Sequence, residues 1–301
     1  ELLQDTHPVR WQWLLHSPGD RKAYPPNDTN KFHFEKRAQR VTDDHLPEVH
    51  APRQAKAQYK FRVMTYNVLT LADKTSTVHK RSKKKKVGKA TLLCNQLLTD
   101  QVLLAGVQES RKPKGSRYLK GYVAVHSGAE RGVHGCSLFA STTIPYGWSR
   151  GKELYLKDKH IKPLVQQPRI LVIHLDAPHF RHVVVVAHAP HSHRPADERA
   201  TFWEDITAYS LRYEPSLLMI DANARVGSYT TEWIGPHGWA QEENENGEAF
   251  HTFLATTGLY AINTLLPNEE GYTWTVGAKG PYHRIDYVAS SKNLLACAHD
   301  V

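Results

Sequence analysis

The sequence has little cysteine, few methionines and no long apolar run. Its three cysteines, Cys94, Cys136 and Cys297, lie far apart in 301 residues and form no Cys-X-X-Cys pair. This spacing argues against a disulfide framework or a zinc knuckle and indicates a reducing compartment. No stretch reaches the roughly 18 apolar residues of a membrane span, no signal-peptide core opens the chain, and no internal repeat occurs. We therefore expect an intracellular protein, and its 40% apolar content supports a sizeable core.

The basic charge is concentrated in one short stretch. The net charge is +9, and the segment "KRSKKKK" at 80–86 contains six basic residues, whereas residues 1–60 nearly balance ten basic residues against eight acidic ones. Such a run is a solvated surface loop, a nuclear-import patch or a contact to nucleic-acid phosphates. We assign the nucleic-acid contact to Lys83, Lys84, Lys85 and Lys86. A nuclear location is an expectation from this run alone.

Two regions of different composition follow one another. Residues 1–58 are polar and proline-rich without a sustained period, and we predict that they form a disordered N-terminal segment. The stretch "VRWQWLL" within it is a short helix or a docking segment, and the sequence leaves this open. From residue 59 to residue 301 we predict one domain, in which several strands follow one another directly and few helices intervene. This order favours two packed sheets with helices outside them over a strict alternation of strands and helices.

Polar side chains stand at the ends of several predicted strands. In "SLLMIDANARVGS" four apolar residues run directly into Asp221, and Asn223 follows two positions later. Burying a carboxylate costs several kcal/mol unless another group pairs with it, so this arrangement calls for a partner. Three other apolar segments end on Asn67, Glu109 and His188. If these strands share a sheet edge, their terminal side chains converge there.

Such a set of side chains suits the hydrolysis of a phosphodiester. Magnesium prefers hard oxygen ligands and keeps several waters, so Glu109 with Asn67 would suffice to hold it. The reaction further needs an in-line water and a donor to the developing negative charge. Asp221 would orient or deprotonate the water, and Asn223 would fix the water or the phosphate. His188 would donate to a phosphate oxygen. Each residue alone also fits an ordinary structural role, and the joint pattern favours the chemical interpretation.

Two other groups of residues leave alternatives open. "HAPHSH" places His188, His191 and His193 close together, as a zinc site would. The H-x-H-x-D-H order of metallo-β-lactamase-type hydrolases is absent, however, and we favour magnesium. Trp239 and Trp274 would line a base pocket or pack in the core, and core packing is the expected role.

Five motifs in order resemble the endonuclease/exonuclease/phosphatase (DNase I-like) family. They are "TYNVLTL", "GVQES", "VVVVAHAPHS", "MIDANARVGS" and "HRIDYV". The stretch from "DANARVGS" through "NENGEAFHTFLATTGLYAINTLLPNEEGYTWT" is similar to the endonuclease domains of non-LTR retrotransposon polyproteins and to craniofacial-development-protein-2-like proteins. The resemblance implies an α/β fold, a four-layer α-β-β-α sandwich over residues 59–301.

The resemblance also implies roles for single residues. Glu109 and Asn67 would bind Mg²⁺, with Mn²⁺ as an alternative. The catalytic residues would be His188, Asp221, Asn223 and Asp286, and Arg225 would join the lysine run in contacting nucleic acid. In the family, the aspartate at the position of Asp286 orients a histidine of a later Ser-Asp-His motif. Only 15 residues follow Asp286 here, and "CAHDV" has the order His299, Asp300. We therefore expect a domain that lacks its C-terminal strand and the catalytic histidine on it.

The expected function is a magnesium-dependent phosphodiesterase of the endonuclease type that hydrolyses the DNA backbone. We expect a monomer without membrane contact, part of a retrotransposon-derived protein with a reverse transcriptase domain on the same polyprotein. The alternatives are a non-catalytic remnant that binds nucleic acid and a phosphatase of the same fold. DNA versus RNA preference stays open.

Overall fold

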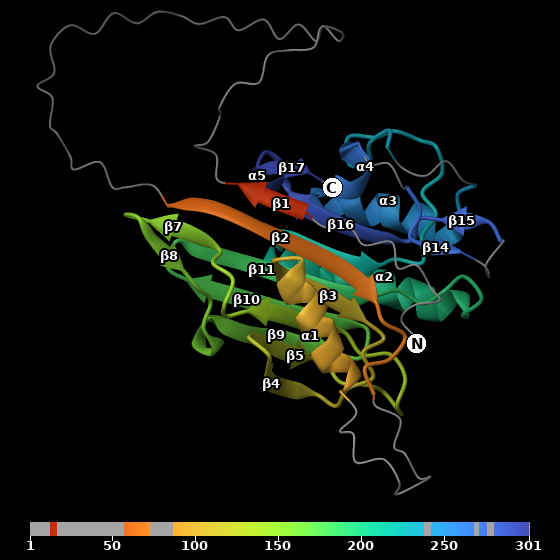
Figure 1. Cartoon of the computed structure of the whole chain (residues 1–301). Coiled ribbons are helices and arrows are strands. Elements are labelled where there is room, and N and C mark those ends of the chain that lie inside the picture. The colour runs from red at the N-terminus through yellow and green to blue at the C-terminus, as the bar shows by residue number, and fades with distance from the viewer. Residues whose placement is uncertain are drawn as a thin grey trace, which may run out of the picture.

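Two large β-sheets form the centre of the molecule (Figure 1). A computed structural model describes residues 13–16, 57–72, 87–237, 242–267, 271–275 and 280–300. The first sheet has the order β17-β1-β2-β3-β6-β5-β4, with β7 pairing β2 and β8 beyond it. Its strands are β1 (Trp13–His16), β2 (Gln58–Asn67), β3 (Val102–Gln108), β4 (Gly115–Leu119), β5 (Tyr122–His126), β6 (Ser137–Ser141), β7 (Gly147–Ser149), β8 (Lys152–Leu154) and β17 (Ala298–Asp300).

The second sheet has the order β13-β16-β12-β11-β10-β9, and a separate hairpin, β14–β15, stands beside it. β11 and β12 run parallel, while β12 and β16 run antiparallel. The strands are β9 (Ile161–Gln167), β10 (Ile170–Ala177), β11 (Phe180–His188), β12 (Leu217–Asp221), β13 (Leu259–Ala261) and β16 (Asp286–Ser291), with β14 (Trp274–Thr275) and β15 (Tyr282–His283) in the hairpin.

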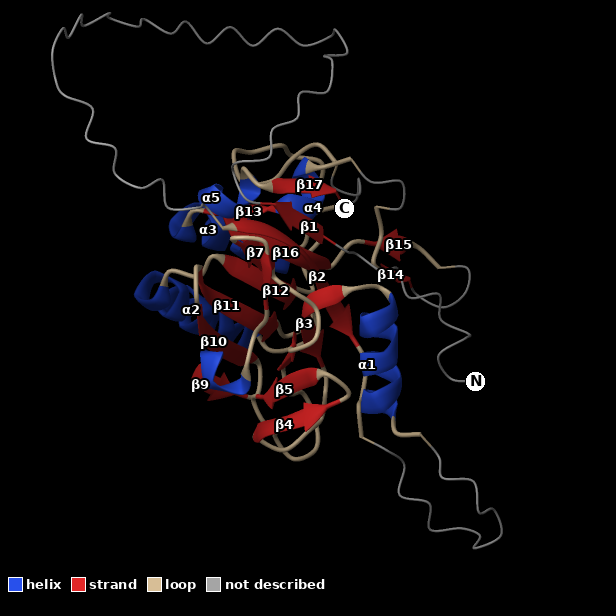
Figure 2. Cartoon of the chain, turned by 60° about the vertical axis from the view of Figure 1, so that its left-hand side comes forward, coloured by secondary structure: helices blue, strands red, loops and turns tan. Residues whose placement is uncertain are grey.

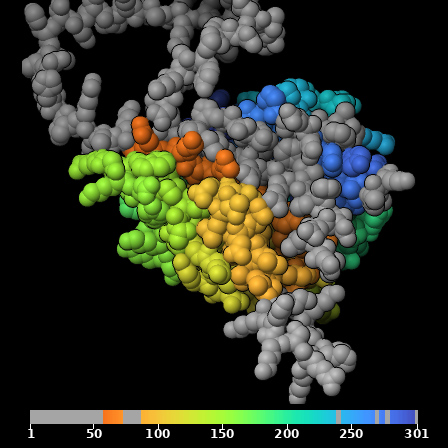
Figure 3. All heavy atoms as spheres, viewed as in Figure 1, coloured from red at the N-terminus to blue at the C-terminus, as the bar shows by residue number. Residues whose placement is uncertain are grey.

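Helices cover the outer faces of both sheets. The helices are α1 (Lys89–Thr99), α2 (Ala196–Tyr213), α3 (Glu245–Thr257), α4 (Ile262–Leu265) and α5 (Lys292–Leu295), with a 3₁₀ turn, η1, at Asp158–His160. Figure 2 shows α1 on one side of the strands and α2 and α3 on the other. In the space-filling view of Figure 3, α1 covers the middle of the face turned to the viewer. The predicted four-layer α-β-β-α sandwich is therefore confirmed.

The two long helices on the second sheet carry recognisable local signals at their ends. Pro195 precedes the first turn of α2, and two acidic residues, Asp197 and Glu198, stand in that turn, where they complement the helix dipole. α3 ends at Gly258, whose φ of 66° is the left-handed conformation that glycine adopts without a steric penalty. Both helices bury their aromatic side chains against the second sheet.

The two sheets approach each other closely next to the predicted site. Gly106 of β3 faces Met219 of β12, and a Cβ atom at position 106 would lie only 2.6 Å from the Met219 Cβ. Real Cβ atoms do not approach so closely, so only glycine fits here. Glu109 lies three residues after Gly106 and Asp221 two residues after Met219. The absence of a side chain at 106 therefore lets the ends of the two strands meet.

Some predictions concern residues outside the described ranges. Lys83, Lys84, Lys85, Lys86 and Trp239 lie there, as does most of residues 1–58. Among the described residues of that N-terminal region, β1 lies between β2 and β17, and β2 begins at Gln58. The domain boundary at residue 59 stays a prediction. No helix in the described part of the chain is long and apolar enough to cross a membrane.

Candidate active site

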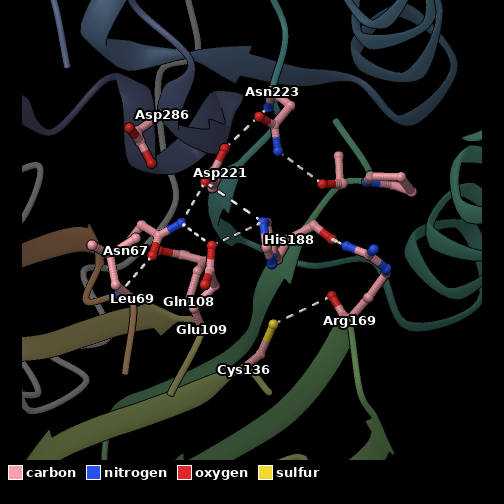
Figure 4. A network of polar contacts seen from close by, with 12 residues as sticks. Asn67, Leu69, Gln108, Glu109, Cys136, Arg169, His188, Asp221, Asn223 and Asp286 are labelled. Carbon is pink, nitrogen blue, oxygen red and sulfur yellow. Dashed lines mark hydrogen bonds and ion pairs between the residues drawn. The ribbon is translucent and has the colours of Figure 1, made fainter. Parts of the chain in front are cut away.

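The polar residues at the strand ends meet where the two sheets face each other (Figure 4). Asn67 ends β2 beside Gln108 of β3, and Glu109 follows directly. In the second sheet, His188 and Asp221 are neighbours in register. Asp286 lies opposite Asp221 on β16. The strand ends converge without sharing one sheet edge, because each of the two sheets supplies part of the cluster.

Asp221 is the buried centre of this cluster, with 3% of its surface exposed. Its Oδ2 accepts a hydrogen bond from Asn67 Nδ2 at 2.8 Å, and its Oδ1 accepts one from the backbone N–H of Asn223 at 3.1 Å. His188 Nε2 stands 3.7 Å from Oδ2. These donors compensate for the lost hydration of the carboxylate. The partner that the sequence requires for a buried Asp221 is therefore present.

Glu109 lies beside Asn67 at the rim of the cluster, and 20% of its side chain is exposed. Asn67 Nδ2 donates to its Oε1 at 3.1 Å, and the Arg111 guanidinium pairs with its Oε2 at 3.2 Å. One amide group of Asn67 therefore contacts both acidic side chains, Glu109 from one sheet and Asp221 from the other.

The carboxylate oxygens of the site fit magnesium better than zinc, while Asn67 turns its Nδ2 toward Glu109 and its Oδ1 accepts the Leu69 N–H at 3.0 Å. Carboxylate and amide oxygens are hard ligands, and magnesium binds with only one or two carboxylates because it retains waters. Within the described ranges, no three His, Cys, Asp or Glu side chains are grouped so that they could enclose a metal ion. A site made by Glu109 and Asn67 would therefore be open to water and substrate. His191 and His193 are exposed and contact each other, with ring centroids 5.9 Å apart.

His188 is buried and held through its backbone. Its N–H donates to the Arg169 carbonyl at 3.0 Å, and its own carbonyl accepts from the Arg169 guanidinium at 3.3 Å. Burial lowers the pKa of the imidazole below its ordinary value, while the nearby Asp221 carboxylate acts in the opposite direction. The ring is therefore neutral at pH 7 and carries one N–H donor.

The backbone of Asp286 is held by hydrogen bonds on both sides. Its N–H donates to Thr273 Oγ1 at 3.1 Å, and its carbonyl accepts from Asn263 Nδ2 at 2.9 Å. Its Oδ1 is buried without a hydrogen-bond partner among the described residues. Burial and the facing Asp221 carboxylate raise the pKa of Asp286 well above its ordinary value. The carboxyl group thus favours its protonated form in this arrangement.

The sequence reasoning missed two residues that border the site. Gln108 is fully buried, and its Nε2 donates to Thr65 Oγ1 at 3.0 Å and to the Met219 carbonyl of the opposite sheet at 3.3 Å. His134 places its ring edge-on to that of His188, with centroids 6.1 Å apart. Burial lowers the pKa of His134 to about 4. The position of Gln108 directly before Glu109 was a usable signal, whereas nothing in the sequence marks His134.

The β14–β15 hairpin carries exposed aromatic side chains next to the strand of Asp286. Trp274 is 45% exposed, so the expectation of core packing was wrong. Its ring stacks on that of His283, with centroids 5.7 Å apart and an interplanar angle of 17°. Arg225, the predicted nucleic-acid contact, is half-buried, and its charge contributes to lowering the pKa of His283 after burial. These three side chains therefore belong to one neighbourhood.

Comparison with known proteins supports the fold. No family model matches the sequence, and no curated protein matches it. Among solved structures, the AP endonuclease LMAP from Leishmania major is similar at 15% identity with a TM-score of 0.55, covering 80% of this chain and 81% of that one. The 3'-5' exonuclease NExo from Neisseria meningitidis is similar at 15% identity and a TM-score of 0.50, covering 79% and 90%. The endonuclease domain of TRAS1, a telomere-specific non-LTR retrotransposon, matches at 16% identity and a TM-score of 0.48, covering 78% and 87%. The chain has the DNase I-like fold of endonuclease/exonuclease/phosphatase proteins.

Proposed function

We propose that this chain is a metal-dependent phosphodiesterase of the endonuclease type that hydrolyses the DNA backbone. The observation that supports this proposal most directly is the environment of Asp221. This buried carboxylate is fixed by donors from Asn67 and Asn223 and lies 3.7 Å from His188 Nε2. A purely structural acid would not need an imidazole and a second acid beside it. The fold, shared with an AP endonuclease and an exonuclease, agrees with this chemistry.

Glu109 and Asn67 would hold the metal, with Mg²⁺ favoured and Mn²⁺ as the alternative. When bound there, the cation would neutralise charge on the phosphate and on the leaving oxygen. The Arg111 guanidinium pairs with Glu109 Oε2 at 3.2 Å, and a cation bound at Glu109 would compete with this pairing. The Arg111 guanidinium would then become available to a phosphate oxygen, to which arginine donates well.

The remaining residues would handle the water and the phosphate. Asp221, with both oxygens oriented by donors, would align the attacking water and accept its proton. Asn223 Nδ2 already donates to the Ala189 carbonyl at 2.9 Å, so its second N–H and its oxygen are left for water or phosphate. The neutral His188 would donate its N–H to a phosphate oxygen as negative charge develops. Asp286, whose pKa is raised by burial and by the Asp221 carboxylate, would supply a further donor beside Asp221 while its carboxyl group is protonated.

The surroundings of the site suit a nucleic acid. The exposed Trp274–His283 stack offers a flat surface on which a base would lie. Arg225 and the lysine run Lys83, Lys84, Lys85 and Lys86 would contact phosphates. The motifs from "DANARVGS" to "HRIDYV" favour a retrotransposon-derived protein, with a reverse transcriptase domain on the same polyprotein as the partner. An intracellular, nuclear monomer fits this role.

The direct test is nicking of supercoiled plasmid in Mg²⁺, in Mn²⁺ and in EDTA. We expect cleavage by the wild-type chain only with a divalent cation. Asp221→Asn, which keeps the shape of the side chain, should slow cleavage by about 10²–10⁴-fold. Asp158→Asn, an exposed acid on η1, is the matched control and should cleave as the wild type does. Folded wild-type chain that leaves the plasmid intact in both metals would refute the proposal.

One observation favours a second candidate, a non-catalytic protein that binds nucleic acid. Asp286 Oδ1 has no partner in the described part of the chain, and a catalytic aspartate of this kind is expected to orient a histidine. DNA binding that weakens steeply with salt, without cation-dependent cleavage, would support this candidate. Absence of DNA binding would exclude it.

A further inference from the structure

The stretch Asn244–Gly247 at the start of α3 packs against the loop that carries Asn223. Asn244 caps α3, and its Oδ1 accepts from the backbone N–H groups of Gly247 and Arg225, both at 2.9 Å. Its Nδ2 donates to the Asn223 carbonyl at 3.0 Å. One side chain thus serves the helix end and the loop together.

Asn246 makes a wider connection. It is 1% exposed, and its Nδ2 donates both to the Pro190 carbonyl at 2.8 Å and to the Asn223 carbonyl at 3.3 Å. Pro190 lies two residues after His188, and Asn223 lies two residues after Asp221. A single amide group therefore links the loop that leaves β11 with the loop that leaves β12.

The other side of Asn246 is fixed by α2. Its Oδ1 accepts from Trp203 Nε1 at 3.2 Å, so the donors and the acceptor of the amide all have partners. The Trp203 ring packs against both Phe250 and Phe253, at centroid distances of 5.9 Å to each. This packing gives Asn246 one orientation, with its two N–H groups toward the loops.

Gly247 shows how closely α3 approaches the same loop. A Cβ atom at this position would lie 2.1 Å from the Arg225 carbonyl oxygen, so no larger residue fits. The glycine therefore allows the helix end to come near enough for Asn244 and Asn246 to reach the Asn223 carbonyl.

The loop needs this support because Asn223 has a left-handed backbone. Its φ is 46°, a conformation of about 1 kcal/mol higher energy for most residues and better tolerated by asparagine. In this conformation the Asn223 N–H points to Asp221 Oδ1, while its carbonyl points to the two asparagines of α3. Fixing the carbonyl therefore also fixes the N–H that orients the carboxylate.

We infer that Asn246 is a positioning residue that holds Asn223 in its left-handed conformation and so sets the orientation of the Asp221 carboxylate relative to His188. It does so by joining the loops after β11 and β12 through one buried amide. The consequence for cleavage rests on the proposed function, whereas the consequence for the loop does not.

The test compares Asn246→Ala with Tyr122→Phe. The control removes another buried hydrogen bond, from the Tyr122 hydroxyl to the Val102 carbonyl at 2.6 Å, at the end of β3 opposite to Glu109. Hydrogen exchange of the Asn223 amide and the kinetics of plasmid cleavage are measured for both. For Asn246→Ala we expect exchange at Asn223 to rise at least tenfold. We expect kcat to fall by about 10–100-fold with KM changed less than threefold, because small misplacements of a catalytic group cost such factors. The control should change neither.

The two readouts separate the possible failures. If wild-type protein cleaves nothing but Asn223 exchange rises in Asn246→Ala alone, the proposed function fails and the positioning role stands. Unchanged exchange at Asn223, or a rise equal to that in Tyr122→Phe, overturns the inference. Should Asn246→Ala not fold, Trp203→Phe decides, because it removes the indole N–H donor to Asn246, together with part of the ring volume, and keeps an aromatic ring. Faster exchange at Asn223 in that variant supports the inference, and unchanged exchange overturns it.

Discussion

Replacement of Asn67 by leucine tests whether one amide group joins the two sheets at the site. Leucine keeps the approximate volume but removes the donors to Asp221 Oδ2 at 2.8 Å and to Glu109 Oε1 at 3.1 Å. A hydrogen bond to a charged group contributes about 1.5–3 kcal/mol. Asp221 is buried, but Glu109 is partly exposed and keeps its Arg111 partner, so its share lies below that range. We therefore expect Asn67→Leu to lower the free energy of unfolding by about 2–4 kcal/mol when no divalent cation is present.

A second variant, Asn67→Asp, adds a prediction about how the stability of the protein depends on divalent cations. It removes the same donors and adds a third carboxyl group between Glu109 and Asp221, so it should be the least stable variant in EDTA. Divalent cations bind more tightly to sites with more charged ligands. Saturating Mg²⁺ should therefore stabilise Asn67→Asp by more than it stabilises the wild type, since ligand at 100 times its Kd contributes about 2.7 kcal/mol.

The assay is urea unfolding followed by tryptophan fluorescence, in EDTA and in Mg²⁺, with equal denaturant slopes as the sign that the unfolding process is unchanged. Asn95→Leu is the matched control, because Asn95 is exposed on α1. Surface substitutions of this kind change stability by less than about 0.5 kcal/mol. A loss for Asn67→Leu that is no larger than that of the control would refute the role of Asn67 as the link between the sheets.

Three further predictions concern the neighbourhood of the site. The native pKa of Asp286 is raised above its ordinary 3.8, so between the unfolded and the native pKa the native state binds more protons, and the free energy of unfolding falls as pH rises through that window. Asp286→Asn should abolish this fall and be more stable than the wild type at pH 7. Parallel stability profiles of the two proteins over pH 4–8 would contradict the assignment. Gly247→Ala should lower the free energy of unfolding by about 1–3 kcal/mol because its Cβ would lie 2.1 Å from the Arg225 carbonyl oxygen. Gly258→Ala, whose Cβ meets open space at φ 66°, should lower it by about 1 kcal/mol. Equal losses in urea unfolding would show that the close approach of α3 to the Arg225 carbonyl does not limit the residue at 247. Trp274→Ala should weaken binding of a single-stranded oligonucleotide by about 1–3 kcal/mol with the melting temperature unchanged, and fluorescence anisotropy that shows equal affinity would remove the stacking role.

The elements that could be predicted from the sequence are those with their own hydrophobic pattern. β3, β12 and the second half of β11 (residues 183–187) are apolar runs with largely buried side chains, and a run of that kind indicates a strand in a sheet interior. β4 and β9 were not predicted. All five residues of "GSRYL" in β4 are exposed or half-buried, and β9 contains a proline. Their strand conformation comes from the neighbouring strands β5 and β10, which a local pattern does not reveal.

The candidate site likewise has features that could be predicted from the sequence and features that could not. Asn67, Glu109, His188 and Asp221 could be proposed because each interrupts an apolar segment at its end, and the interruption is visible in the sequence. The sequence does not show that these residues come from two sheets, since the packing of one sheet on the other depends on which face of each sheet is covered. The close approach at Gly106 and Met219, which brings Glu109 and Asp221 together, joins residues more than a hundred positions apart.

The motif "NENG" shows a third case, in which the signal is visible but its meaning is not. The side chains of Asn244 and Asn246 contact backbone carbonyl and N–H groups of the loops beside the site. Backbone groups are the same at every position. A sequence can therefore mark such a residue as unusual without indicating its partner. The same reasoning applies to Asp221. Its burial is tolerable only with one donor from Asn67 of the first sheet and another from the Asn223 loop, which α3 supports. The carboxylate is thus satisfied only when both sheets and the helix layer are in place, so the site is a product of the whole sandwich and not of any single motif.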